Sequence, residues 1–307
     1  MILQLDPDAL PSRLLETNFA ALDFVWPGFP VKTVGSWVGQ GGCGKSFLAM
    51  IGGLSIALGR RFGGDTPKRG KVLYLAAEDP LDQLGLRVQN ILTYWGVKPG
   101  SDELARVDAN FHLFALLGQE HDLMRTEDHE LVILNQLSNL VAGFGDGGDP
   151  LRLIVVDTLR RFHNLDENDG CEMSSLLSVM ERMALNFNCG VLFIHHITKN
   201  AALNDQADLQ QASKGNGCLT DNIRYQSNVV NMTKDESKTL SFDAGKTKIG
   251  DGRKYYVRLV TPKNNYGPPL DNQWFRRDAK TGVLDPVNLV PFNKAGDMPR
   301  PKPVGAR

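Results

Sequence analysis

The residues best suited to chemistry lie in one glycine-rich stretch at positions 39–46. The stretch reads Gly39-Gln40-Gly41-Gly42-Cys43-Gly44-Lys45-Ser46 and fits the pattern G-x-x-x-x-G-K-[ST]. Its glycines allow a tight turn that aims backbone N–H groups at a phosphate. Lys45 would reach the β- and γ-phosphates of ATP, and Ser46 would place its hydroxyl on Mg²⁺. We therefore predict an ATP-binding segment that ends at Phe47.

The segments on either side of this loop favour that interpretation. Residues 31–38 have the pattern of a strand, and the apolar run that starts at Phe47 predicts a helix. The N-terminus of such a helix attracts anions through its dipole and its free N–H groups. The alternative is a glycine-rich turn that arose by chance, and the agreement of pattern and context argues against it.

Two further apolar runs end in carboxylates. Residues 71–77 predict a buried strand followed by Glu78, and residues 151–156 predict another that ends in Asp157. Ligands bind at the carboxyl edge of parallel strands. We expect Asp157 to hold Mg²⁺, the alternative being an N-cap. Thr158 follows it where a second acid could stand, so Glu78 is the candidate for orienting the attacking water, unless it is a surface acid at a helix start.

A third apolar run, residues 190–194, ends in two histidines. Neighbouring residues of a strand point to opposite faces, so His195 and His196 would chelate a metal poorly. His196 would then be a sensor of the γ-phosphate at the sheet edge, and the alternative is a structural histidine.

Alternating strand and helix patterns predict an α/β fold with a mostly parallel central sheet and flanking helices. Helices are expected at 81–95, 128–142 and 172–187, and a short strand at 111–114. From Asp221 onward the pattern is that of β-structure, with strands near 255–260 and 273–277. We expect an N-terminal arm at 1–22, an ATPase domain at 23–290 and a disordered basic tail at 291–307.

Composition narrows the class of protein. The chain has 307 residues, 42% of them hydrophobic, and four cysteines without a C-x-x-C pair, which suits free thiols in the cytoplasm. We expect no signal peptide and no membrane contact. The net charge is −1, but residues 244–307 hold 13 basic and 5 acidic residues, so +8 there faces −9 in the rest. That region could contact nucleic acid or form a solvated surface.

Several longer strings resemble the RepA family, the hexameric replicative helicases of IncQ-type plasmids within the RecA/DnaB-like P-loop ATPases. The resemblance runs from about Phe24 to Leu284. The strings that carry it are Val156-Asp157-Thr158-Leu159-Arg160-Arg161-Phe162-His163, Ile194-His195-His196, Gln210-Gln211-Ala212-Ser213, Asp221-Asn222-Ile223-Arg224, Asn265-Tyr266-Gly267 and Trp274-Phe275-Arg276-Arg277.

The resemblance implies a RecA-type core, a ring of six subunits and ATP-driven translocation on single-stranded DNA. It makes Glu78 the catalytic carboxylate, His196 a switch residue and Arg224 an arginine that reaches a neighbour's ATP. It also implies replication initiator and primase proteins as partners. Lys199 and Lys214, on loops after the third apolar run, are the expected DNA contacts, although the family's pattern has arginine in place of Lys214. The acidic loop at 163–170 suits DNA poorly.

Two other functions use the same ATP site. One is a RecA-like DNA-binding ATPase that does not unwind DNA, such as a loader or a recombination mediator. The other is a small-molecule kinase, which needs an acceptor site and an arginine-rich lid that the sequence does not display. Strand displacement separates the first from a helicase, and ATPase stimulation by DNA separates the second.

Overall fold

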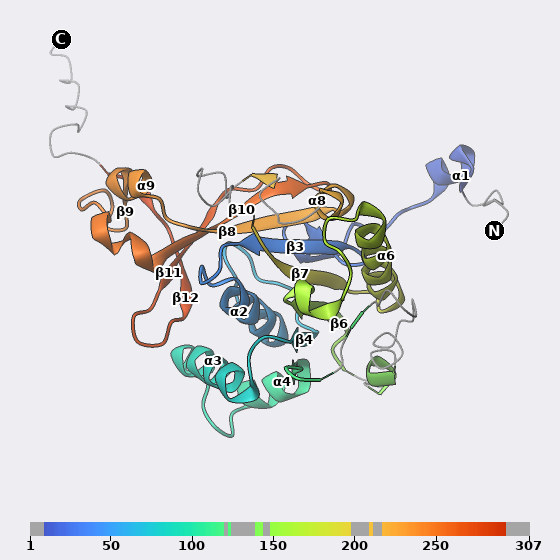
Figure 1. Ribbon diagram of the computed structural model, residues 1–307, viewed down its shortest axis with the longest axis horizontal. Coiled ribbons are helices and arrows are strands. Elements are labelled where there is room, and N and C mark those ends of the chain that lie inside the picture. Colours follow the sequence, from blue (N-terminus) through green and yellow to red (C-terminus); the bar gives the residue numbers. More distant parts are fainter. Residues whose placement is uncertain are drawn as a thin grey trace, which may run out of the picture.

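A computed structural model describes residues 9–119, 122–123, 139–143, 148–197, 209–210 and 217–292. Among these residues, nine strands form one sheet in the order β12-β11-β10-β8-β3-β7-β6-β4-β5. Figure 1 shows the sheet running through the molecule with helices on both faces. The α/β class expected from the sequence is confirmed.

Six neighbouring strands of the sheet are parallel. They are β3 (Val34–Gly39), β4 (Lys71–Ala76), β5 (Phe111–Ala115), β6 (Leu151–Asp157), β7 (Gly190–His196) and β8 (Tyr225–Asn231). Nearly all residues of β3, β4, β6 and β7 are buried. Continuous apolar runs are typical of strands covered on both faces, and this burial explains why the sequence revealed them.

Two hydrophobic cores lie on opposite faces of the sheet. The helices α2 (Lys45–Leu58), α3 (Leu81–Tyr94) and α4 (Asp102–Asn110) cover one face (Figure 1). The helices α6 (Gly170–Asn186) and α8 (Cys218–Asn222) cover the other. Successive residues of β4 alternate between them, since Val72 and Tyr74 join the first core and Leu73 and Leu75 the second.

An antiparallel extension continues the sheet beyond β8. It consists of β10 (Tyr256–Asn264), β11 (Gln273–Arg277) and β12 (Leu284–Val287). The short strands β9 (Leu240–Ser241) and β13 (Val290–Pro291) pair beside it, with α9 (Lys234–Thr239) and the 3₁₀ turn η4 (Gly250–Tyr255) nearby. Met232, Ile249 and Tyr256 form a small core of their own there. The C-terminal β-rich extension is confirmed, and β13 crosses the expected boundary at residue 290.

The N-terminal part has two short elements before the sheet. The helix α1 (Pro11–Glu16) buries none of its residues and stands away from the body in Figure 1. Leu15 is 88% exposed and Phe19 is 66% exposed. The segment expected to be a turn at 24–28 instead forms a hairpin of β1 (Phe24–Trp26) and β2 (Phe29–Pro30), because Gly28 turns the chain at a φ of 80°.

Other differences from the expected elements are local. The strand expected at 31–38 begins at Val34, and the approach to β8 contains the helix α8. The short helices α4 and α9 were not expected. Most of the helix expected at 128–142 lies outside the described residues. Within the described part of the chain, no helix is both long and apolar enough to cross a membrane.

Candidate functional site

The carboxyl ends of four parallel strands bring the expected site residues to one edge of the sheet. Gly39 at the end of β3 pairs with His196 at the end of β7, and Ala76 of β4 pairs with Asp157 of β6. A cavity of about 560 Å³ lies at this edge. The side chains and loop residues that line it include Gly41, Gly42, Lys45, Ser46, Phe47, Glu78, Thr158, His196 and Arg277.

The glycine-rich loop has the backbone that phosphate binding requires. Gly42 and Gly44 adopt φ values of 76° and 104°, which residues with a Cβ rarely adopt. A Cβ at Gly41 or Gly42 would meet no heavy atom within 4 Å, so the concave side of the loop has room for a phosphate. Lys45 is buried and its Nζ donates to the backbone carbonyl oxygens of Gly39 and Gln40, at 2.8 and 2.7 Å. The loop therefore holds its cation beside the N-terminus of α2.

Asp157 lies at the centre of a hydrogen-bonded group. The Ser46 hydroxyl donates to its Oδ1 at 3.0 Å, and the Tyr74 hydroxyl lies 2.7 Å from its Oδ2 and 2.9 Å from the Ser46 carbonyl oxygen. Burial raises the pKa of Asp157 to about 6. A hydroxyl and a carboxylate are oxygen ligands of the kind that Mg²⁺ takes. This pair therefore fits the magnesium site expected from the sequence.

Glu78 is positioned by a neighbouring strand. It follows β4, and its Oε1 accepts a hydrogen bond of 2.8 Å from the hydroxyl of Thr158, the residue after Asp157. Thr158 is buried, whereas Glu78 is exposed at the cavity wall. The two expected acids therefore share one site, and a threonine holds one of them.

The two histidines at the end of β7 point to opposite faces. His196 lines the cavity on the face of α2. His195 is 1% exposed and its ring lies 6.4 Å from that of Phe193, in the core on the α6 face. The alternation expected from strand geometry is confirmed, and only His196 is placed to contact a ligand in the cavity.

Comparisons with known proteins agree with this geometry. A family model described as an AAA domain, AAA_25, matches residues 3–202. The chain belongs to this family. The fold is also similar to the solved ATPase domain of a phage helicase, with a TM-score of 0.55 and 10% identity over 83% of this chain and 84% of that one. A match this low in identity shows the fold alone, which is the RecA-like P-loop core. Family and site geometry together support an ATP hydrolase.

The AAA domain match ends before the extension, yet the extension also reaches the cavity. Arg277 of β11 donates through Nη2 to the carbonyl oxygen of Cys43, at 3.2 Å. Thr281, in the turn after β11, accepts a hydrogen bond of 3.1 Å from Asn90 of α3. The sequence did not reveal these wall residues or Tyr74. A tyrosine inside an apolar strand was the one available signal, because a buried hydroxyl needs a partner.

Arg224 lies away from the cavity of its own subunit. It is exposed and directly precedes β8, whose first residue Tyr225 pairs with Gly35 near the start of β3. The P-loop follows Gly39, at the other end of that strand. The structure therefore does not bring Arg224 together with the other expected site residues. Lys199 and Lys214 lie outside the described residues.

Proposed function

We propose that this protein is an ATP-driven DNA helicase of the RepA type, which works as a ring of six subunits on single-stranded DNA during plasmid or phage-like replication. The observation that carries the proposal is the convergence of Lys45, Asp157, Glu78 and His196 on one cavity, while Arg224 lies at the far end of the sheet. Replication initiator and primase partners belong to the same proposal.

The chain's residues divide the work of hydrolysis. ATP supplies the phosphoryl group and Mg²⁺ neutralises charge on it. Lys45 and the loop N–H groups would hold the phosphates, and Ser46 with Asp157 would hold the metal. Glu78 would orient a water and take its proton, because it is the carboxylate that faces the cavity from the neighbouring strand. His196 would sense the γ-phosphate from β7.

A ring explains the position of Arg224. Phosphoryl transfer uses a cation that stabilises charge in the transition state, supplied by the same subunit or by a neighbour. Head-to-tail packing would bring the Arg224 end of one subunit to the cavity of the next, and such contacts close into rings. The arm at α1, which exposes Leu15 and Phe19, would cover apolar surface on a neighbour.

Strand displacement on a forked duplex tests the helicase directly. Unwinding that requires ATP and disappears in Lys45→Ala supports it, and mass in solution with and without ATP reports the ring. ATPase activity that single strands stimulate without any displacement would instead indicate a loader or mediator. Neutralising Lys199 and Lys214 together should weaken single-strand binding and leave basal ATPase nearly intact.

A further inference from the structure

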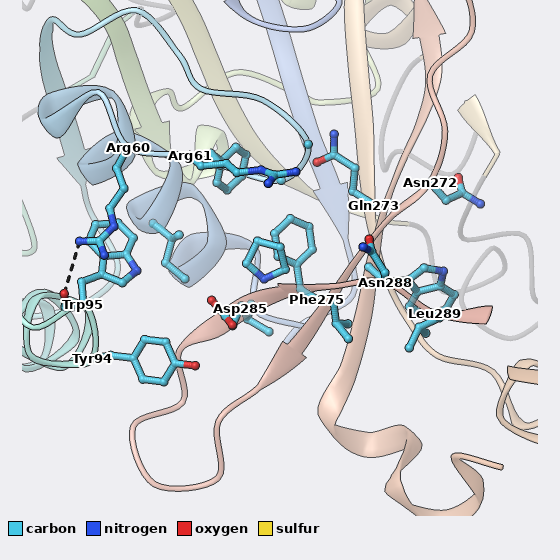
Figure 2. A pocket seen from close by; sticks show the side chains of 18 residues that line it. Arg60, Arg61, Tyr94, Trp95, Asn272, Gln273, Phe275, Asp285, Asn288 and Leu289 are labelled. Carbon is cyan, nitrogen blue, oxygen red and sulfur yellow. Dashed lines mark hydrogen bonds between the residues drawn. The ribbon is translucent and has the colours of Figure 1, made fainter. Parts of the chain in front are cut away.

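A hollow separate from the ATP cavity combines arginines with aromatic rings. It measures about 750 Å³ and lies between the end of α2, the end of α3 and strands β11 and β12. The Arg60 guanidinium lies 5.0 Å from the ring centroid of Trp95, and Figure 2 shows the two side by side. Arg61 is exposed at the wall, and Trp274 of β11 completes the aromatic lining.

A second hollow of about 490 Å³ adjoins the first and shares Tyr94 and Asp285 with it. Figure 2 shows Tyr94 pointing toward Asp285. Arg276 and Tyr255 line the second hollow, and Arg276 also lies 5.4 Å from the ring centroid of Phe242. We call the two hollows together the arginine–aromatic groove.

The charge of the groove favours an anionic ligand. Arg60, Arg61, Arg276 and Arg277 line it, against the acids Asp278 and Asp285. The chain's own segment 293–307 carries four basic residues and one acid, so like charge opposes its binding there. Arginine stacked on an aromatic ring keeps its N–H edge available to phosphate.

The rings favour bases that are not paired. Trp95, Trp274 and Tyr94 are each partly exposed, with Tyr94 at 40%. Aromatic side chains stack on the faces of bases, which a duplex hides and a single strand offers. A groove that tracks phosphates with cations and carries such rings is the common form of single-strand binding sites.

We propose that the arginine–aromatic groove binds single-stranded DNA, with bases against Trp95 and Trp274 and phosphates beside Arg61 and Arg276. It is a contact distinct from Lys199 and Lys214. The choice of DNA over RNA rests on the proposed helicase function.

Tryptophan fluorescence gives a local readout of this groove. Of the four tryptophans, Trp26 and Trp37 are buried, at 6% and 0% exposure, while Trp95 and Trp274 line the groove. The full chain without nucleotide is titrated with the oligonucleotide (dT)₁₂. Binding should quench the fluorescence, and the log of the affinity should fall linearly with log salt.

Charge reversal identifies the residues responsible. The double variant Arg61→Glu and Arg276→Glu should weaken quenching at least about fivefold and lower the salt slope by about 0.7 for each lost phosphate contact. Arg106→Glu, an exposed arginine on α4 that does not line the groove, is the matched control and should behave as wild type. Asp285→Asn removes an acid that pairs across from Arg276 and should strengthen binding, which misfolding cannot imitate.

Three results would overturn the proposal. One is quenching that the double variant and Asp285→Asn both leave unchanged. Another is quenching by a peptide of residues 293–307 but not by (dT)₁₂, which would make the groove a peptide site. Equal or stronger quenching by (rU)₁₂ would overturn the assignment to DNA. Because the titration needs neither ATP nor unwinding, its failure is separate from failure of the strand-displacement test.

Discussion

Glu78 is the residue on which the assignment of hydrolysis depends most directly. Its carboxylate faces the cavity, whereas Asp157 is buried and bonded to Ser46 and Tyr74. We predict that Glu78→Gln keeps ATP binding and loses turnover by about 10²-fold or more, because the amide cannot take a proton from water. Nucleotide affinity and steady-state ATPase are the measurements. Wild-type turnover in this variant would assign the base to another acid.

Thr158 acts through Glu78. Its hydroxyl is 2.8 Å from Oε1 of Glu78, and a hydrogen bond to a charged group fixes the orientation of that group. Thr158→Val keeps the shape and removes the hydroxyl, so we expect kcat to fall about tenfold with KM for ATP nearly unchanged. Thr158→Ser restores the donor and should restore most of the rate. Equal loss in both variants would show that the site needs the threonine methyl group and not the hydrogen bond.

At the scale of elements, the loop between β6 and α6 carries a histidine that links stability to pH. His163 is buried, and its Nδ1 accepts a hydrogen bond of 3.2 Å from the N–H of Leu165. Burial, with the charge of Arg160 adding to it, lowers the pKa of His163 to about 4. As the pH falls below the ordinary value of 6.5, the unfolded chain takes up a proton that the folded chain refuses. The free energy of unfolding therefore falls between about pH 6.5 and 4.

Urea unfolding at several pH values tests this loop. Between about pH 7 and pH 5, His163→Asn should lose about 2 kcal/mol less stability than wild type, because asparagine can accept the same hydrogen bond but does not titrate. His112→Asn, at a partly exposed histidine on β5, is the comparison. Parallel pH dependence in wild type and His163→Asn would show that the loop opens and protonates without cost.

The elements also show how far the sequence could lead. Strands β4, β6 and β7 were predicted because each is a buried apolar run with a polar end. The helix α4 was missed because it buries little beyond Val107, although Ser101 accepts from the N–H of Leu104 as an N-cap. Thr233 and Glu236 form a capping box that could have located α9.

The site divides in the same way. Lys45, Ser46 and Asp157 follow from motifs that keep their spacing whatever the rest of the chain does. Arg277 could not be placed, because it reaches Cys43 across 234 positions through the pairing of β10 with β8 and β11. Contacts of that kind depend on strand order, which no local pattern records.

At the scale of the whole molecule, the sheet separates two halves of one proposed reaction centre. The P-loop lies at the carboxyl edge, after Gly39, and Arg224 lies before β8 at the other edge. Each subunit would therefore offer a cavity at one end and a cation at the other. A ring is the arrangement in which every cavity meets a cation and no end is left over.

Mixing two inactive variants tests that arrangement. Arg224→Ala should bind nucleotide yet hydrolyse it about 10³-fold more slowly, because it lacks the cation that stabilises the transition state. Lys45→Ala should be inactive because it lacks the cation on the β- and γ-phosphates. In mixed rings, some interfaces join an intact P-loop to an intact Arg224, so the mixture should recover part of the ATPase that neither variant shows alone. If light scattering shows that mixed rings form and activity stays absent, Arg224 does not act on a neighbour, and the exposed arginine before β8 has a role within its own subunit.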